Sequence, residues 1–457
     1  MRRTSQNLLM TCRSSLLTFM MKGLSILGGF FVLREKREKE IFCVPGCNNS
    51  IKLLLRRMQT LAICIPTFIV GTLVRSVILF IKIVVSLLMP EQLFSYRQLF
   101  DFTKSVLQKI GCSDADADKA TRVLLSADLR GIDSHGVARL SGYVRLWEVK
   151  RVNTTPSIKT IHETPSTAVV DGDSGLGLVV APHAMQIAID KAKQVGTGWV
   201  SVQNSNHFGI AGFHAMMALE HDMIGIALTN ASPLVAPTFS VERLLGTNPI
   251  CVAIPAGEEP PFVGDMATTT AANGKLEILQ RKSGIAPVGW IQNKDGNVST
   301  DPFELKAGGA LLPLGSDKEH GSHKGYILGS IVDIFSAVLS GANYGPWVPP
   351  FPAYVPMPDE QPGKGIGHFF GAMRIDAFRP AEEFKKHMDK WIKRFRSAKT
   401  IKGQEKVLIP GDPEREMEID RMKNEIPLLK PVVEDLKYLG EKFEIIFPEN
   451  PQSAIPA

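Results

Sequence analysis

The sequence has few cysteines, and their distribution excludes a disulfide-stabilised fold for most of the chain. Four of the six lie among residues 1–88, which leaves only Cys112 and Cys251 for the remainder. Two scattered cysteines indicate a reducing compartment and no disulfide framework. Cys43 and Cys47 have neither the spacing nor the neighbouring histidine of a zinc site. We therefore predict no metal site.

The sequence also lacks the G-x-G-x-x-G pattern that follows a strand in Rossmann dinucleotide-binding domains. The glycines in residues 171–177 come in another order, and this segment predicts a turn rather than a phosphate-binding loop. The missing pattern disfavours a conventional Rossmann dehydrogenase.

Acidic residues are scarce near the N-terminus, and charge divides the chain into two parts. Residues 1–88 contain thirteen Lys/Arg and three Asp/Glu, whereas the remainder contains 39 basic and 43 acidic residues. The net charge of +6 therefore conceals a mildly acidic body. An acidic body gives no reason to expect nucleic acid as a partner. We expect an apolar, basic extension over residues 1–88 and a globular body over residues 89–457.

The extension contains an uncharged run, Met58–Val74, directly after Arg56 and Arg57. Seventeen uncharged residues reach the lower limit for crossing a hydrocarbon core of about 30 Å. Basic residues before the run favour a cytoplasmic location for that side. Two interpretations stay open. The run is a membrane anchor for a cytoplasmic body, or translation properly begins at Met89 and the extension is not made.

The apolar periodicity of the body predicts an α/β protein. Ser95 and Ser113 are candidate N-caps of two helices that end at Gly111 and Gly131. Strands are expected over residues 167–171, 198–202, 223–228, 250–255, 261–264 and 367–375, and helices over 182–195, 327–339 and 380–396. The proline-dense residues 346–362 predict a loop.

Two histidines lie in segments that favour chemistry. His207 is in the segment 202–214, which predicts a strand, a polar turn and a helix, and α/β folds bind ligands at such turns. An ordinary loop histidine is an equally good interpretation of that segment alone. His135 and Arg139 are four residues apart and share one face if their segment is helical. A proton donor and a carboxylate clamp would need that arrangement.

Six short motifs follow one another along the body. They are Asp133-Ser134-His135-Gly136, Ser205-Asn206-His207-Phe208-Gly209, Gly246-Thr247-Asn248-Pro249, Asp265-Met266-Ala267-Thr268, His323-Lys324-Gly325-Tyr326 and Pro410-Gly411-Asp412. With these motifs in this order, the chain resembles the malate/L-lactate dehydrogenase family that lacks a Rossmann domain, from about Pro90 to the C-terminus. Six ordered motifs are a specific match, whereas any one of them would be weak.

The resemblance implies an unusual α/β fold with a mixed sheet, a homodimer, and an NAD- or NADP-dependent enzyme. Its substrate would be a small 2-oxoacid or 2-hydroxyacid. Such a fold accounts for the missing Rossmann pattern. Two residues depart from the family pattern, Ile327 at a usual glycine and Gly264 at a frequent apolar position. Both departures bear on cofactor packing, and neither removes a reactive group.

The resemblance also implies roles for single residues. His135 and His207 are candidate acid/base groups, because an imidazole exchanges protons near neutral pH. Arg139 is the candidate bidentate partner of a substrate carboxylate, with Ser134 as a second donor. The structural alternatives are a hydrogen-bonded loop histidine, a surface arginine paired with an acid, and a helix-capping serine.

Three segments are candidate cofactor contacts. Their residues are Asp265, Met266 and Ala267, then Lys324 and Gly325, then Gly411, Asp412 and Pro413. Asp265 could hold a ribose hydroxyl, and Lys324 at a helix start suits a phosphate. The alternatives are a strand-end turn, a solvated lysine and a generic Pro-Gly-Asp turn.

Two classes of function therefore remain. One is an NAD(P)-dependent oxidoreductase that interconverts a small 2-oxoacid and a 2-hydroxyacid. The other is an inactive relative that serves as a membrane-associated binding or scaffold protein. The joint presence of His135, Arg139, His207, Asp265 and Lys324 favours the enzyme.

Overall fold

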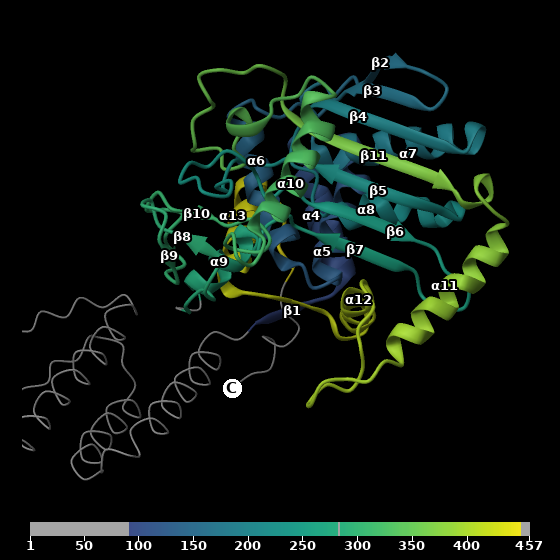
Figure 1. The fold of residues 1–457 in the computed structure, drawn as a ribbon. Coiled ribbons are helices and arrows are strands. Elements are labelled where there is room, and N and C mark those ends of the chain that lie inside the picture. Colours follow the sequence, from purple (N-terminus) through teal and green to yellow (C-terminus); the bar gives the residue numbers. More distant parts are fainter. Residues whose placement is uncertain (1–90, 282–283, 449–457) are drawn as a thin grey trace, which may run out of the picture. The chain divides into compact units, whose positions relative to one another are not determined.

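The central feature of the computed structural model, which describes residues 91–281 and 284–448, is a seven-stranded sheet (Figure 1). Its strands, in spatial order, are β2 (Lys159–Glu163), β3 (Thr167–Asp171), β4 (Thr197–Ser205), β11 (Ile366–Arg374), β5 (Met223–Thr229), β6 (Ile250–Ile254) and β7 (Phe262–Met266). β3 and β4 run parallel, and the other neighbouring pairs run antiparallel. The sheet is therefore mixed, as expected, and differs from the parallel sheet of a Rossmann fold.

The remaining elements surround this sheet. Two smaller sheets consist of β1 (Gln92–Phe94) with β12 (Ile426–Leu428), and of β10 (Ala310–Leu311), β8 (Ile291–Gln292) and β9 (Val298–Ser299). The α-helices are α4 (Tyr96–Lys109), α5 (Asp114–Leu129), α6 (Leu140–Glu148), α7 (Gly177–Val195), α8 (Ala211–Met216), α9 (Asn273–Arg281), α10 (Ser322–Asp333), α11 (Ala381–Arg396), α12 (Asp412–Asn424) and α13 (Lys430–Phe443). Short helical turns are η1 (Asp133–His135), η2 (Val137–Arg139), η3 (Met217–His221), η4 (Ile334–Val338), η5 (Gly345–Trp347) and η6 (Ile375–Ala377).

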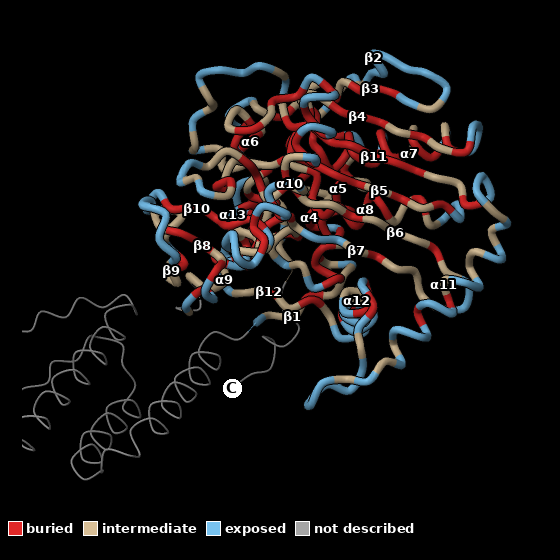
Figure 2. The backbone as a smooth tube through the Cα atoms, viewed as in Figure 1, coloured by how far each residue is buried: buried red, intermediate tan, exposed pale blue. Residues whose placement is uncertain are grey.

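One face of the main sheet packs against α7 and α8. Alternate residues of the strands, including Val200, Ala227 and Phe370, are buried in one apolar cluster with Ala184 and Ala188 of α7. The burial of strands and the exposure of outer helices are visible in Figure 2. Small residues at this contact let the helices approach the sheet closely.

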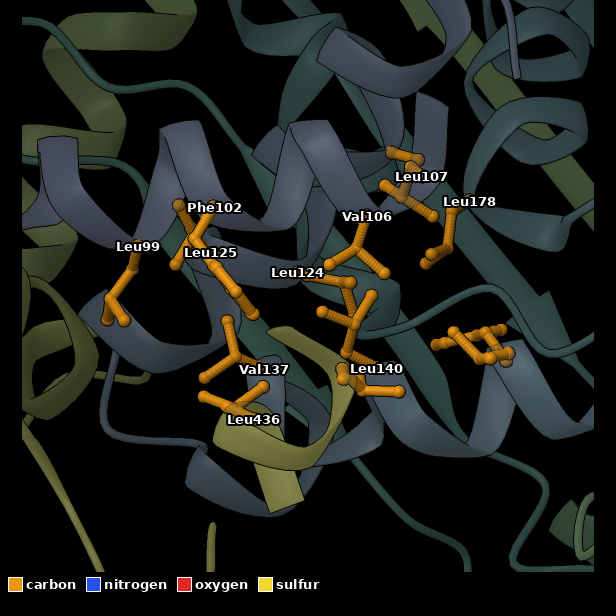
Figure 3. Close-up of a cluster of buried hydrophobic side chains, with 14 of the residues drawn as sticks. Leu99, Phe102, Val106, Leu107, Leu124, Leu125, Val137, Leu140, Leu178 and Leu436 are labelled. Atoms are coloured by element: carbon orange, nitrogen blue, oxygen red, sulfur yellow. The ribbon is translucent and has the colours of Figure 1, made fainter. Parts of the chain in front are cut away.

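A second core lies among the helices α4, α5, α6 and α13. Leu99, Val106, Leu124, Leu140 and Leu436 are fully buried there or nearly so (Figure 3). Ser95 caps α4 through a reciprocal bond with Gln98, and Ser113 caps α5 by accepting the N–H of Asp116. Both N-caps predicted from the sequence are confirmed, because the apolar spacing after each serine continues as a buried helix face.

Several element boundaries differ from the expected ones. β4 continues three residues past Val202, so Gln203, Asn204 and Ser205 belong to the strand rather than to the turn. The helix expected at 327–339 begins earlier, at Ser322, and ends in the π-helical turn η4. The polar side chains of Gln203 and Asn204 hid the end of β4 in the sequence, because they read as turn formers. In the structure both donate to the carboxylate of Asp171 at the end of β3.

The N-terminal extension and its run Met58–Val74 lie outside the described residues. Among the residues that are described, no helix is both long enough and apolar enough to cross a bilayer.

Strand glycines at the helix-covered face should be intolerant of a methyl group. In Gly198→Ala the new Cβ would collide with the backbone carbonyl of Ala188 in α7. Because backbone cannot yield as a side chain does, we expect a loss of about 1–3 kcal/mol in unfolding free energy. Gly264→Ala is the matched strand control, since its Cβ would meet only the Phe262 ring, at 3.2 Å. Equal thermal midpoints for the two variants would contradict this account.

Candidate active site

The segment that carries Ser134, His135 and Arg139 is irregular, not one helix. Two 3-10 turns, η1 and η2, are separated by Gly136, whose φ of −88° and ψ of −146° break the helical path. The condition under which His135 and Arg139 would share one helix face is therefore not met. The segment is held instead by Asp128 at the end of α5, whose Oδ2 accepts the Val137 N–H at 2.8 Å.

Gly136 is required beside Asp128, because a Cβ there would overlap the carboxylate. Burial raises the pKa of Asp128 to about 8, while the Val137 N–H opposes that change. Arg421 of α12 bonds the backbone carbonyl of Asp128 and the carboxylate of Asp133. Side chains from α5 and α12 thus hold the backbone of residues 133–137 in place.

Arg139 lies folded back on its own segment. Its Nε donates to the carbonyl of Ser134 at 2.6 Å, and its Nη2 lies 3.4 Å from Glu277 Oε2 on α9. Its guanidinium also lies over the Phe351 ring, 5.8 Å from the centroid. The contact with Glu277 is the longer of the two hydrogen bonds that the guanidinium makes.

His207 follows β4 and meets three other residues. Its Nδ1 lies 2.6 Å from the hydroxyl of Tyr143 in α6 and 3.3 Å from the backbone N of Gly209. The Phe351 ring lies 4.8 Å from the imidazole, centroid to centroid. A half-buried imidazole held at one nitrogen has its other nitrogen available for a ligand.

The structure brings the two candidate histidines together. The rings of His135 and His207 lie 5.6 Å apart with planes at 22°. Both keep some solvent contact, yet the surrounding protein removes most of their hydration. Burial, followed by the charge of Arg139, lowers the pKa of His135 to about 4. The pKa of His207 is held well below its ordinary value by burial and then by His135 and Arg139.

Two further histidines, for which the sequence suggested no role, hold the turn of His207 in place. His368 in β11 bonds Ser205 Oγ at 2.8 Å and stacks on the Phe208 ring at 4.8 Å. His214 in α8 bonds the carbonyl of Phe208 at 2.8 Å. Both are fully buried. Their contribution is structural, because each ring bonds the backbone or a side chain of the turn and is shielded from solvent.

Asp265, in the first candidate cofactor segment, bonds the start of α8. Its Oδ2 accepts the N–H of Gly212, at the start of α8, at 2.7 Å. The residue retains solvent contact, as does Met266, while Ala267 is half-buried. The surrounding protein nevertheless removes part of the hydration of Asp265 and raises its pKa to about 6.

The second candidate segment lies beside the first. Thr268 donates its N–H to Thr247, and Leu314 donates to the carbonyl of Thr268. Gly325 packs against Leu314 so tightly that a Cβ would overlap its backbone. Lys324 is exposed in the first turn of α10. A residue larger than glycine at position 325 would therefore clash with the backbone of Leu314. Lys324 has a position that suits a phosphate.

The third segment has a different character. Gly411 has a φ of +96° and packs against Val263 of β7. Asp412 is buried, accepts the N–H of Ile409 and pairs with Arg396 and Arg415. These bonds occupy its carboxylate and hold its pKa below the ordinary value, although burial alone would raise it. Pro413 follows in the first turn of α12.

A family model described as malate/L-lactate dehydrogenase matches residues 94–437. The chain belongs to this family. It is 44% identical to malate dehydrogenase of Pyrococcus horikoshii over 346 residues, 76% of this chain and 94% of that protein. It is 40% identical to L-sulfolactate dehydrogenase of Methanocaldococcus jannaschii over 317 residues, 69% of this chain and 87% of that protein.

The fold agrees with this membership. The solved structure of malate dehydrogenase from Entamoeba histolytica matches with a TM-score of 0.73 at 34% identity, covering 79% of this chain and 100% of that one. Membership in the malate/L-lactate dehydrogenase family assigns the protein to the oxidoreductases that act on the CH–OH group of 2-hydroxyacids. The resemblance and the α/β fold with a mixed sheet, both expected from the sequence, are confirmed.

Sequence reasoning missed five residues around the malate/L-lactate dehydrogenase motifs. They are Asp128, Tyr143, Glu277, Phe351 and Arg421. Tyr143 follows Arg139 by four residues, and this spacing was the one local signal that could have drawn attention to it. The others reach the site from distant segments, and no local pattern marks them.

The buried imidazole of His214 predicts a measurable pH dependence of stability. Its pKa falls from 6.5 to about 4 on folding, mainly because burial penalises the charged ring. The unfolded chain therefore binds the extra proton first, and stability present above about pH 6.5 is lost as pH falls toward 4. For one such group the loss reaches at most about 3 kcal/mol.

His214→Gln keeps an N–H donor for Phe208 and cannot titrate. We expect this variant to lose less stability than the wild type between pH 7 and pH 4.5. Thermal midpoints at the two pH values test this expectation, with exposed His320→Gln as the matched control. Parallel pH profiles for wild type and His214→Gln would show that the ring is not a source of acid sensitivity.

Proposed function

We propose that the protein is an NAD(P)-dependent dehydrogenase that interconverts a small 2-hydroxyacid and the corresponding 2-oxoacid. The observation that carries the proposal is the meeting of His135, His207 and Arg139. The Asp265 turn bonds Gly212 at the start of α8, in the segment that follows His207. Two neutral imidazoles and a guanidinium are the groups needed to exchange a proton and hold a carboxylate.

Substrate orientation is assigned to Arg139. Its planar guanidinium presents paired N–H donors that match a carboxylate, and Phe351 holds its plane from one side. Ser134 Oγ lies 2.9 Å from His135 Nδ1, which places a hydroxyl beside the reacting groups. A 2-oxoacid bound through its carboxylate would then present its carbonyl oxygen to the histidines.

The residues at the Asp265 and Lys324 segments fit a dinucleotide. A bound nicotinamide cofactor would supply or accept the hydride. The exposed ammonium of Lys324 at the start of α10 suits a phosphate, and the solvent-facing carboxylate of Asp265 suits a ribose hydroxyl. Asp412 supports these segments indirectly, because its carboxylate is already bound to arginines.

The scaffold alternative is not favoured. An inactive relative would have no need to keep neutral, hydrogen-bonded imidazoles next to a partly accessible arginine, since buried polar groups cost stability unless they are satisfied. Named dehydrogenases among the relatives support the enzyme as well.

The test is a spectrophotometric screen of small 2-oxoacids with NADH and NADPH, followed by Arg139→Lys on the best substrate. The lysine keeps the charge and loses the paired donors. We expect KM to rise about 10- to 100-fold, the scale of a lost charge-assisted hydrogen bond. Exposed Arg97→Lys is the control. No turnover with any 2-oxoacid would refute the function. An unchanged KM for Arg139→Lys would show that another residue binds the substrate carboxylate.

We also propose that the enzyme works as a homodimer, joined through an apolar face on α10 and η4. Side chains at helical spacing are exposed along this face: Tyr326, Ile327, Ile331, Ile334, Phe335, Val338 and Leu339. An amphipathic helix of a soluble protein faces its apolar side inward, and a contiguous exposed patch of this kind marks an interface. A second copy is the occupant that the family resemblance implies.

Val338→Asp should therefore convert the dimer to monomer, because Val338 is 52% exposed and lies at the C-terminal end of the face. Burying a carboxylate without a partner is costly. Sedimentation of the full chain measures the mass, with Ile419→Asp on α12, 66% exposed, as the control. A wild-type monomer, or a dimer that tolerates Val338→Asp, would contradict this interface.

A further inference from the structure

The backbone N–H of Gly209 reveals the protonation state of His207. That N–H lies 3.3 Å from His207 Nδ1 and can only donate. A nitrogen that accepts a hydrogen bond from an amide carries no proton of its own. Gly209 is itself fixed, since it has a φ of +82° and a Cβ there would meet Val123 and Leu178. The Gly209 N–H therefore cannot point away from His207 Nδ1 unless the backbone around Gly209 changes its conformation.

Tyr143 adds a second donor at the same nitrogen. Its hydroxyl lies 2.6 Å from Nδ1, and because Nδ1 is an acceptor, the tyrosine is the donor. The phenol is fully buried, and burial raises the pKa of Tyr143 further above its ordinary value. It therefore stays protonated, and neutral His207 carries its proton on Nε2.

His135 is held in a different way. Its Nδ1 lies 2.9 Å from the hydroxyl of Ser134, which can donate or accept. The hydroxyl can rotate to suit a neutral or a charged ring, so His135 gains or loses a proton without losing this bond. His207 has less freedom, because a proton on its Nδ1 would face the Gly209 N–H, which can only donate. The Tyr143 hydroxyl would then have to turn its proton from Nδ1 to the carbonyl of His207, a longer contact of 3.4 Å. The neighbours of His207 reinforce the difference, because the Arg139 guanidinium, and His135 when it is protonated, both disfavour its imidazolium.

We propose that Tyr143 is a positioning residue which, with the Gly209 N–H, locks His207 as an uncharged Nε2–H donor to the substrate oxygen and leaves proton exchange to His135. This inference rests on the proposed dehydrogenase function. In the oxidation of a 2-hydroxyacid, the hydroxyl proton moves to His135. The hydride leaves the substrate carbon with the C–H electron pair for the oxidised nicotinamide, and the O–H pair becomes the second bond of the carbonyl.

A proton relay through Tyr143 is the competing arrangement. In it, His207 would give its Nε2 proton to the substrate oxygen while taking the phenolic proton at Nδ1. That step would leave a tyrosinate in a fully buried position next to other aromatic rings. Desolvation of a charge at such a site is costly. The locked donor needs no charged intermediate on either residue.

The lock can be tested without substrate or cofactor. Nitrogen-15 NMR of the histidine-labelled full chain distinguishes an unprotonated imidazole nitrogen from an N–H, and His207→Gln assigns the signals. We expect an unprotonated Nδ1 and a protonated Nε2 at pH 7. In Tyr143→Phe the Gly209 N–H still favours an unprotonated Nδ1, but the shorter bond of 2.6 Å is lost. The ring should therefore titrate at higher pH, and its Nδ1–H form should rise above the wild-type population. Exposed Tyr354→Phe, 84% exposed, should leave the spectrum unchanged.

The division of roles needs a kinetic comparison. A glutamine amide can keep the N–H donor of His207 and cannot exchange a proton. His207→Gln should therefore retain at least about tenfold more kcat than His207→Ala, whereas His135→Gln and His135→Ala should both fall about 100-fold or more. Equal losses for the two His207 variants, together with near-normal turnover without His135, would overturn the assignment.

The outcomes separate this inference from the proposed function. A protonated Nδ1 in the wild type would overturn the lock even if the enzyme reduces 2-oxoacids. An unprotonated Nδ1 in a protein that turns over no 2-oxoacid would refute the function and the division of roles with it.

Discussion

The reactive side chains lie on irregular backbone, and buried polar groups from other elements hold that backbone in place. Asp128 accepts the Val137 N–H and fills the space beside Gly136, so that Ser134 and His135 stand on a fixed turn. His368 and His214 do the same for the turn of His207. Helix and strand ladders cannot satisfy such turns, and an unsatisfied buried group costs about 1–3 kcal/mol. Satisfying these groups therefore fixes the active site and the core together.

This dependence explains why the order of elements matters. α5 supplies Asp128, β11 supplies His368 and α12 supplies Arg421, and these three elements are far apart in the sequence. β11 lies in the main sheet between β4 and β5, and 136 residues separate it from the end of β5 on the chain. The His207 turn is therefore fully supported only when β11 has paired. Formation of the site is then coupled to closure of the sheet, in keeping with the late formation of non-local contacts.

Local patterns predicted the elements well where one face meets a core. The helices after Ser95 and Ser113 and the strand at 167–171 follow directly from apolar spacing. The motifs located His135 and His207, and no local pattern could show that Phe351 from a proline-rich loop contacts His207. The helical spacing of His135 and Arg139 misled for a physical reason. Gly136 interrupts the helical path, and the Asp128 carboxylate of the preceding helix occupies the space beside it. The spacing of His135 and Arg139 alone could not indicate this contact.

Under the proposed function, the same arrangement would link substrate binding to the proton affinity of His135. The charge of Arg139 contributes to the low pKa of His135, and Glu277 offsets that charge only through a 3.4 Å contact. A substrate carboxylate bound to the guanidinium would neutralise it more closely than Glu277 does, because Coulomb interaction grows as charges approach. The proton affinity of His135 would then rise when the substrate is in place. A base that strengthens on binding would accept the hydroxyl proton only when there is a substrate to oxidise, and Ser134 can follow that change by rotating its hydroxyl.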